Sequence, residues 1–281
     1  MDPSITVLIP AYNCCGTIAN CLKSLQAQSV KPTEVMVVDD CSNDGTGDVV
    51  RGFKNIKLLQ RVERGGAGAA RATGARVARG DIIAFIDSDC VAPSDWLESI
   101  LLQFTRNSKI GAVGGMYRHC DADDLVAIFG KFEEEFLHYN FSLQPFDSTL
   151  TGGNMAVRRK VWSNARSGRE LIYFQNVASS EDTVVANEIR EISETFFSAD
   201  IFVWHTPKSS FLGFMKRNFT RARTRMISNL NSLSPQGDNL FNAFGGFRLF
   251  WSAACLWGLL PSMVLFFSGS EYFLTGLVLL V

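Results

Sequence analysis

The chain from residue 80 to residue 89 runs Gly80-Asp81-Ile82-Ile83-Ala84-Phe85-Ile86-Asp87-Ser88-Asp89. Its apolar residues predict a strand over 81–86, and two carboxylates follow directly where that strand ends. In open sheets of parallel strands, ligands bind beyond the carboxyl ends of the strands. The motif therefore predicts an α/β fold with Asp87 and Asp89 at the binding edge of its sheet.

Strand-like runs alternate with helical stretches on both sides of this motif. The expected strands are 5–9, 34–38, 56–62 and 81–86, and the expected helices are 17–26, 46–53, 66–79 and 94–104. Pro10 is expected to stop the first strand. Such alternation predicts a parallel, doubly wound sheet with helices on its faces. Further strands are expected over 110–117, 150–157 and 196–204, and further helices over 125–139, 181–192 and 211–230.

Length and composition indicate a folded protein with a sizeable core. The 281 residues are 47% hydrophobic and 20% charged, which excludes a disordered polymer, a collagen-like repeat and a disulfide-stapled mini-protein. A net charge of −1 argues against a nucleic-acid coat, so we expect no nucleic-acid partner. Seven scattered cysteines without a C-x-x-C pair suit a reducing compartment and argue against a zinc site.

An uncharged apolar segment, 249–270, predicts attachment to a membrane. At about 1.5 Å per residue, a helix of that length reaches across a bilayer. Gly258 and Pro261 interrupt it, so a kinked transmembrane helix and a re-entrant hairpin both remain open; a buried core helix is the alternative. We therefore expect a catalytic domain over 1–231 and a membrane region over 232–281, which a short apolar run at 272–281 suggests is truncated.

Charge segregation predicts the orientation of that membrane region. Between Asp200 and Asp238 the only charged residues are six basic ones. The positive-inside rule then places the preceding domain in the cytoplasm, at an inner or plasma membrane. The basic stretch 211–230 resembles an interfacial helix that binds anionic headgroups.

The carboxylates and an arginine suggest a site for a metal and a diphosphate. Asp87 and Asp89 together can hold Mg²⁺ or Mn²⁺ with phosphate oxygens; the alternative is that they merely cap a turn. Arg71 lies on a small-residue helix that Gly65 and Gly66 open, where a guanidinium can grip a diphosphate. This helix follows the third strand and carries Arg71 at the sixth position of the glycine motif, so we do not expect NAD.

Four motifs, in this order, resemble the signatures of family 2 glycosyltransferases. They are Ile5-Thr6-Val7-Leu8-Ile9-Pro10-Ala11-Tyr12-Asn13, Val37-Val38-Asp39-Asp40-Cys41-Ser42-Asn43-Asp44-Gly45-Thr46, Gly68-Ala69-Ala70-Arg71 and the run 80–89. The resemblance covers about residues 4–105 and extends more weakly to about 225. It implies the GT-A fold, a Rossmann-like α/β domain with a mixed sheet flanked by helices.

The resemblance also implies roles in binding a nucleotide-diphosphate sugar. Pro10, Tyr12 and Asp40 would bind the base of the nucleotide. Arg71 would face the nucleotide or its diphosphate. Asp87 would lie near the ribose and the metal, and the resemblance implies that Asp89 ligates the metal directly.

Later motifs extend this implied site. Gly153 and Asn154 resemble residues beside the donor sugar and the acceptor, although Gly153 is alternatively part of a tight turn. Asp182 corresponds to the catalytic base; Glu181 is a second candidate, and Asp182 is alternatively a capping carboxylate. His205 corresponds to a residue that contacts metal or phosphate, with a purely structural role as the alternative.

These features predict an inverting, metal-dependent glycosyltransferase that moves a sugar to a glycan or lipid-linked acceptor in envelope glycan or glycolipid synthesis. The Q-x-x-R-W element of processive members is absent from the sequence, which disfavours a polymer-extruding synthase. A phosphatase with an aspartyl nucleophile would need that Asp after the first strand, whereas Asp87 follows the fourth, so the sequence disfavours this class. A catalytically silent, membrane-tethered nucleotide-sugar-binding scaffold is the alternative from another class.

Overall fold

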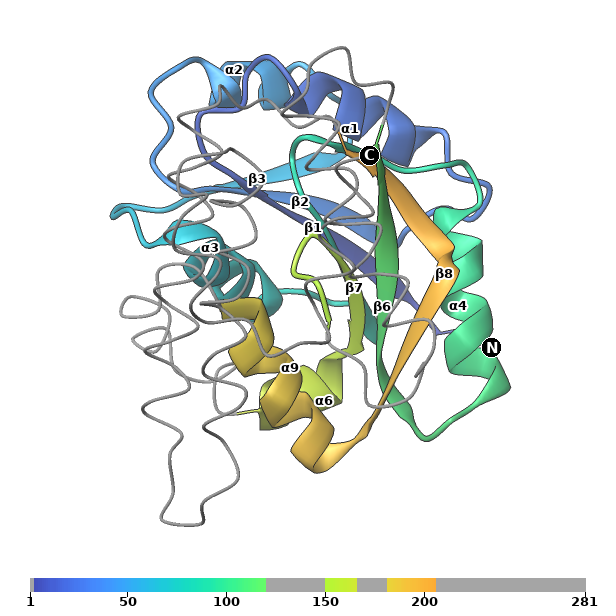
Figure 1. Ribbon diagram of the computed structural model, residues 1–281. Helices are drawn as coiled ribbons and strands as arrows, with labels where there is room; N and C mark the ends of the chain where they lie inside the picture. The colour runs from blue at the N-terminus through green and yellow to red at the C-terminus, as the bar shows by residue number, and fades with distance from the viewer. Residues whose placement is uncertain (1–2, 120–149, 166–180, 206–281) are drawn as a thin grey trace, which may run out of the picture. The chain divides into compact units, whose positions relative to one another are not determined.

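A computed structural model of the chain describes residues 3–119, 150–165 and 181–205 (Figure 1). These residues belong to the first of two compact units, Met1–Ser210. The expected helices 125–139 and 211–230 and the apolar segment 249–270 lie outside the described residues. None of the described helices is long and apolar enough to cross a membrane.

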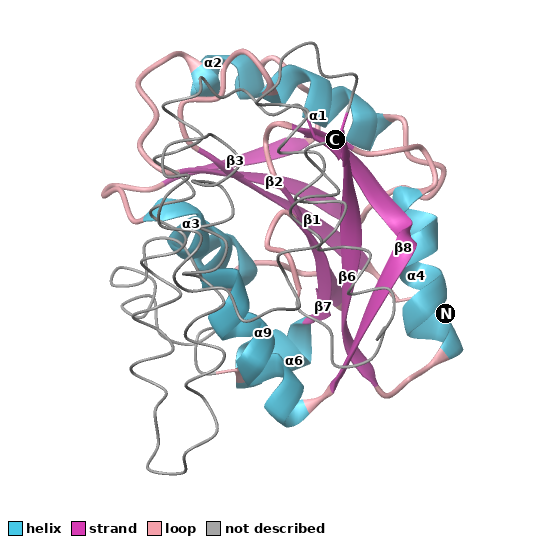
Figure 2. Ribbon diagram, viewed as in Figure 1, coloured by secondary structure: helices cyan, strands magenta, loops and turns pink. Residues whose placement is uncertain are grey.

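The described strands form one sheet in the order β3-β2-β1-β4-β7-β6-β8-β5 (Figure 2). The strands are β1 Ile5–Ala11, β2 Glu34–Asp39, β3 Ile56–Gln60, β4 Ile82–Ile86, β5 Cys90–Val91, β6 Ile110–His119, β7 Asn154–Arg158 and β8 Glu194–His205. The helices are α1 Ile18–Gln26, α2 Thr46–Arg51, α3 Gly66–Ala75, α4 Trp96–Arg106, α6 Arg159–Asn164 and α9 Glu181–Ile192.

Strand direction divides the sheet into a parallel part and a mixed part. β1 pairs in parallel with β2 and β4, and β2 pairs in parallel with β3, as the strand–helix alternation predicts. β7 runs antiparallel to both β4 and β6, whereas β6 and β8 are parallel. β5, which the sequence did not reveal, pairs antiparallel with β8. The mixed α/β sheet implied by the resemblance is confirmed, and a parallel doubly wound sheet is wrong beyond β4.

The prediction that Pro10 stops the first strand is also wrong. β1 continues to Ala11, and Pro10 lies opposite Val38 of β2. The pairing of β1 with β4 ends earlier, at Leu8 and Phe85. Beyond Leu8, β1 therefore has a paired strand on one side only, and a residue without an N–H group is tolerated there.

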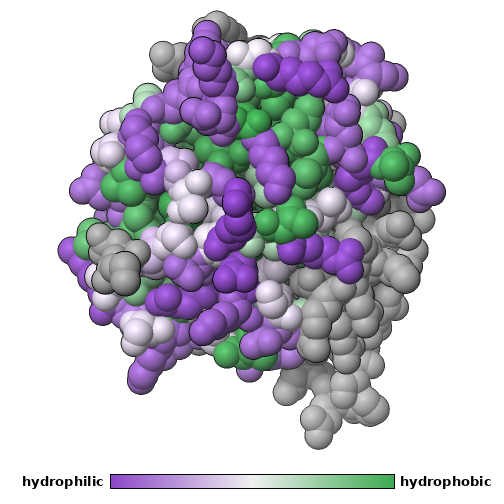
Figure 3. Space-filling view, turned by 180° about the vertical axis from the view of Figure 1, so that it is seen from behind, coloured by the Kyte–Doolittle hydropathy of each residue, from purple (hydrophilic) through white to green (hydrophobic). Residues whose placement is uncertain are grey.

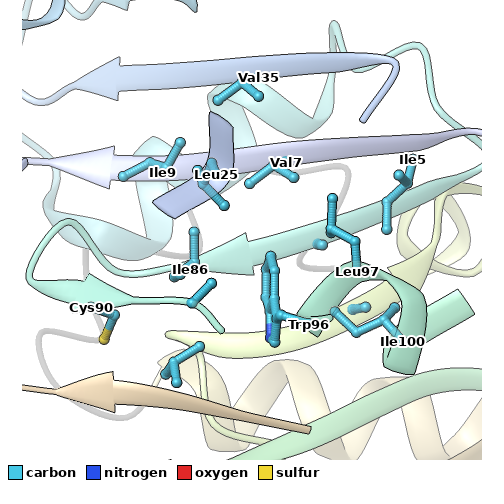
Figure 4. Close-up of a cluster of buried hydrophobic side chains, with 14 of the residues drawn as sticks. Ile5, Val7, Ile9, Leu25, Val35, Ile86, Cys90, Trp96, Leu97 and Ile100 are labelled. Carbon is cyan, nitrogen blue, oxygen red and sulfur yellow. The ribbon is translucent and has the colours of Figure 1, made fainter. Parts of the chain in front are cut away.

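Two apolar cores cover the two faces of the sheet. On one face, Val7 and Ile9 of β1 pack with Leu25 of α1 and with Trp96 and Ile100 of α4 (Figure 4). The other core packs the intervening β1 residue Leu8 with Ala69 of α3, Trp162 of α6 and Ile189 of α9. Because successive strand residues face opposite sides of a sheet, one apolar strand serves both cores.

Helix α3 lies close against the sheet because its buried residues are small. A Cβ atom at Gly74 would overlap the Leu8 side chain and would lie 2.8 Å from Cγ2 of Val38. These contacts hold α3 against β1 and β2. Any residue on its buried face therefore has a closely defined position relative to the sheet.

The face opposite to that of Figure 1 shows hydrophilic residues with hydrophobic ones between them (Figure 3). Large hydrophobic side chains that are exposed among the described residues include Val62, Leu102 and Ile192, which belong to three separate parts of the chain. Single exposed apolar residues are usual at a protein surface and carry no functional signal.

Candidate functional site

The loops that follow β1 and β2 join at the carboxyl edge of the sheet. The Asp40 N–H donates to Ala11 O (2.8 Å), and the Asn13 N–H donates to the Ser42 hydroxyl (2.9 Å). The Asn43 N–H donates in turn to the Asn13 side-chain oxygen (3.0 Å). The ends of these two strands therefore meet through direct contacts.

Buried thiols support the turn that follows β4. Cys21 of α1 donates from Sγ to Asp87 O (3.6 Å), and Cys90 Sγ lies 3.8 Å from Asp89 Oδ1. Burial, together with the nearby charges of Asp87 and Asp89, raises the pKa of both thiols. Both thiols are therefore neutral, and Cys21 links the Asp87–Asp89 turn to α1.

Asp40 is buried and is held by the loop that leads into α3. Its Oδ1 accepts from Arg61 Nη1 (2.9 Å) and from the Gly65 N–H (3.0 Å). Its Oδ2 accepts from the N–H groups of Gly65 (3.1 Å) and Gly66 (2.7 Å). The carboxylate predicted to bind the base is thus already hydrogen-bonded to this loop.

Tyr12 and Pro10 occupy different environments after the same strand. Tyr12 is 40% exposed, and Cζ of Arg64 lies 3.9 Å from the centroid of its ring. Pro10 is buried within β1. Of the two, Tyr12 is the side chain that offers a surface on which a base can stack.

Arg71 and Asp87, which the sequence places 16 residues apart, form an ion pair. Arg71 Nη2 lies 2.7 Å from Asp87 Oδ1, and the arginine side chain is 6% exposed against 34% for the aspartate. A Cβ atom at Gly152 would lie 2.9 Å from Arg71 Nη1. The guanidinium therefore packs closely against Gly152, where a side chain would force it to move.

Gly153 also brings its main chain close to Asp87. A Cβ atom here would overlap Asp87 Oδ2 and the Tyr117 hydroxyl, so both groups lie close to the Gly153 main chain. The Asp87 N–H also donates to Gly153 O (3.3 Å). Gly153 thus lies between the Arg71–Asp87 ion pair and Tyr117, near the end of β6.

Asn154 is a structural residue of the core in this structure. Its side chain is fully buried, accepts from Trp96 Nε1 (3.0 Å), and donates to Met116 O (2.9 Å) and Ile201 O (3.2 Å). These bonds hold α4, β6 and β8 together. The buried amide therefore supports the loop that carries Gly153 and is turned into the core.

Asp89 pairs with His205, which β8 brings from the far end of the described chain. His205 Nε2 lies 3.4 Å from Asp89 Oδ2, and the imidazole lies 5.5 Å from the Tyr117 ring between centroids. Partial burial opposes ionisation of Asp89, but the hydrogen bond and charge of His205 outweigh it, so the pKa of Asp89 is lowered. Asp89 is ionised at neutral pH.

Asp89 fits the metal that the resemblance implies. Its side chain is 42% exposed and ionised, which suits a hard divalent cation. The described residues contain no group of three or more His, Cys, Asp or Glu side chains arranged around a common point. Mg²⁺ is usually held by one or two carboxylates together with substrate phosphates, and Asp89 and Asp87 are carboxylates of the kind that such a site uses.

The two candidate bases begin a helix, as predicted. Glu181 and Asp182 start α9, whose bounds Glu181–Ile192 agree with the predicted helix. Their side chains lie outside the described part of the structure. The choice between them stays a prediction.

The structure adds Tyr117, Arg61 and Arg64 to the candidate site. Tyr117 ends a predicted strand, and the rule that singled out Asp87 applies to it equally. Arg61 was hidden because the predicted third strand ran to residue 62, whereas β3 ends at Gln60. Arg64 had no sequence signal, because its stacking on Tyr12 depends on the loop conformation.

Comparison with known proteins identifies relatives of this chain. The model of glycosyl transferase family 2 matches residues 6–164. Glycosyltransferase AglE of Haloferax volcanii is 39% identical over 102 residues, which are 34% of each chain. The UDP-Glc:alpha-D-GlcNAc-diphosphoundecaprenol beta-1,3-glucosyltransferase WfgD of Escherichia coli is 32% identical over 133 residues, 47% of this chain and 51% of that protein. The match thus spans a third to a half of these relatives.

Solved structures share the fold. The mannosyltransferase PcManGT from Pyrobaculum calidifontis, in complex with GDP-Man and Mn²⁺, superposes with a TM-score of 0.66 at 21% identity, covering 99% of this chain and 81% of that one. TarS 1–349 of S. aureus gives a TM-score of 0.57 at 20% identity, covering 87% of this chain and 80% of that one.

Proposed function

Because the chain belongs to glycosyl transferase family 2, we propose that it transfers a sugar from a nucleotide-diphosphate sugar to an acceptor hydroxyl with inversion at the anomeric carbon. The observation that carries this proposal is the Arg71–Asp87 ion pair with the Asp89–His205 pair beside it, at the carboxyl edge of β4 and β8. A cationic group and ionised carboxylates at one sheet edge suit a metal-bound diphosphate.

The donor would be bound along this edge. Tyr12 offers an exposed ring for the base, next to Arg64 and the buried Asp40. Arg71 would hold the diphosphate, because a guanidinium binds phosphate oxygens through two parallel hydrogen bonds. The relative with GDP-Man and Mn²⁺ bound supports a donor of this class.

Asp89 and Asp87 would hold Mg²⁺ or Mn²⁺ on the diphosphate, with His205 keeping Asp89 ionised and in place. When bound, the metal would offset the charge that develops on the departing diphosphate. Arg71 would share that task by keeping its guanidinium beside the leaving group.

Proton transfer is assigned to the start of α9. Asp182 would take the proton from the acceptor hydroxyl while the hydroxyl oxygen bonds to the anomeric carbon. The bond from that carbon to the diphosphate oxygen breaks, and the nucleoside diphosphate leaves. One displacement of this kind inverts the anomeric configuration, and Glu181 is the second candidate for the base.

The acceptor is proposed to be a glycan or a lipid-linked sugar at the plasma membrane. The acceptor named for the Escherichia coli relative is a sugar on diphosphoundecaprenol. The basic stretch and the apolar segment 249–270 of the present sequence support a membrane location with the catalytic domain in the cytoplasm.

The proposal is tested with the full chain and a panel of nucleotide sugars in Mg²⁺ or Mn²⁺. We expect metal-dependent release of a nucleoside diphosphate that Asp89→Ala abolishes. Asp48→Ala, which changes an exposed aspartate of α2, is the matched control and should release it normally. The anomeric configuration of the product, read by NMR, tests inversion.

Two outcomes would overturn parts of the proposal. Nucleotide binding without transfer or donor hydrolysis for any sugar would indicate the silent scaffold instead. Asp182→Asn is expected to keep nucleotide affinity and lose turnover, so normal turnover in that variant would reject Asp182 as the base.

A further inference from the structure

The Asp40 carboxylate is bonded to the start of α3, the helix that carries Arg71. It accepts from the N–H groups of Gly65 and Gly66 at 2.7–3.1 Å, and the Asp40 side chain is only 3% exposed. Gly65 precedes α3 and Gly66 is its first residue. A carboxylate at this end of a helix also interacts favourably with the helix dipole.

The loop before α3 is built around this carboxylate. Gly66 has a φ of +84°, which a glycine adopts without strain and other residues rarely adopt. A Cβ atom at Gly65 would lie 2.8 Å from Ala69 Cβ and on the Arg61 guanidinium, which itself bonds Asp40 at 2.9 Å. The two glycines therefore allow their own N–H groups and the Arg61 guanidinium to donate to the same carboxylate.

Because Arg71 lies on α3, the position of the start of α3 sets the position of Arg71 in the site. Arg71 lies five residues after Gly66, is buried, and ends 2.7 Å from Asp87. The opposite end of α3 is fixed by the close contact of Gly74 with Leu8 and Val38. Asp40 thus supplies the polar attachment at the first turn, where the helix has unpaired N–H groups to satisfy.

We infer that Asp40 is a positioning residue, which fixes the start of α3 and thereby holds the Arg71 guanidinium beside Asp87 where a diphosphate would bind. The inference rests on the proposed function, since it assigns Arg71 to the diphosphate. A role as a positioning residue differs from a role in binding the base. If Asp40 positions Arg71, its loss should also weaken the binding of a ligand that has no base.

The test uses inorganic pyrophosphate, UDP and GDP as probes, with Mn²⁺ and the full chain, and measures dissociation constants by calorimetry. Asp40→Asn keeps the shape of the side chain but puts an amide donor opposite N–H groups. We expect it to weaken pyrophosphate and the preferred nucleoside diphosphate by roughly tenfold or more each, because a charged acceptor has been removed from buried donors.

A double-variant cycle asks whether Asp40 acts through Arg71. In the Arg71→Ala background, Asp40→Asn should cause no further loss of pyrophosphate affinity, since the group that it positions is gone. Additive losses, or a loss confined to UDP or GDP with pyrophosphate unchanged, would overturn the inference. Failure of the unmodified chain to bind any of the three probes would instead reject the proposed function.

A glycine variant tests the same link without touching a charged group. Gly66→Ala strains the backbone at φ +84° while its new Cβ meets nothing within 4 Å, and we expect it to weaken pyrophosphate as Asp40→Asn does. Gly45→Ala is the matched control: its φ is +88°, its surroundings are equally open, and it precedes α2. Equal pyrophosphate affinities for both alanine variants would contradict the inference even if Asp40→Asn failed to fold.

Discussion

Replacing Gly152 with alanine should impair donor use while leaving the fold almost unchanged. The new Cβ would lie 2.9 Å from Nη1, 3.0 Å from Cζ and 3.2 Å from Nη2 of Arg71, where ordinary contacts begin at 3.4 Å. The guanidinium would have to retreat by about 0.5 Å, a distance at which close-packed groups already lose much of their attraction. The group that moves is the far end of a side chain, so the backbone need not shift.

That displacement acts on an ion pair whose members lie 2.7 Å apart. Charge-assisted hydrogen bonds depend on close approach and alignment, and misplacement by about 1 Å can cost a hundredfold in rate. We therefore expect kcat/KM for the donor to fall roughly tenfold in Gly152→Ala. The assay is nucleoside-diphosphate release over a range of donor concentrations, with the melting temperature measured in parallel.

Controls separate the position of Arg71 from general damage. Gly47→Ala places its Cβ 3.5 Å from Arg51 Nη1 and Gln60 Nε2, an ordinary contact, and should be neutral. Gly152→Ala added to Arg71→Ala should reduce activity no further. Unchanged kcat/KM in Gly152→Ala, or an equal loss with and without Arg71, would refute the reasoning.

Three more perturbations follow from the described contacts. Gly74→Ala should destabilise the fold by about 1–3 kcal/mol in urea unfolding, because its Cβ would overlap Leu8 on the sheet; wild-type stability would show that α3 can move away. Tyr12→Ala should weaken UDP or GDP and leave pyrophosphate affinity unchanged, since pyrophosphate has no base to stack on the ring; an equal loss for pyrophosphate would reject that role. For Glu34, burial raises the pKa, but hydrogen bonds from the Arg79 N–H, the Thr6 hydroxyl and the Arg79 side chain outweigh it, so the folded pKa lies below the ordinary 4.5. Its contribution to stability is therefore present above pH 4.5 and is lost as pH falls through the folded pKa. Below pH 4.5, the melting temperature should fall more steeply in wild type than in Glu34→Gln. Parallel curves of melting temperature against pH for the two proteins would contradict this.

Sequence patterns predicted those elements whose signal is local. The buried strand 82–86 followed by Asp87 and Asp89 was found because apolar runs and strand-end carboxylates are adjacent in the chain. The bounds of α9 were predicted because its apolar residues recur at helical spacing over a full 12 residues. Both signals need no information about distant partners.

The remaining features depend on contacts between distant segments. Strand direction in β7 and the two-residue β5 follow from which strands lie beside them, and no periodicity encodes that choice. Asn154 lies beside Gly153 in the sequence, yet its amide is buried against Trp96 and two strands, which only the packed structure reveals. The hydrogen bonds of Asp40 to Gly65 and Gly66 likewise span 25 and 26 residues, and no local pattern in the sequence reveals them.

The antiparallel placement of β7 has a consequence for synthesis of the chain. β4 is complete at residue 86, but the strand that pairs with its other edge begins only at residue 154. A nascent chain that has emerged as far as β4 therefore carries the fully apolar strand Ile82–Ile86 with one edge unpaired, a template for association with other chains. The Arg71–Asp87 pair likewise gains its neighbours Gly152 and Gly153 only after the segment that leads into β7 has been synthesised.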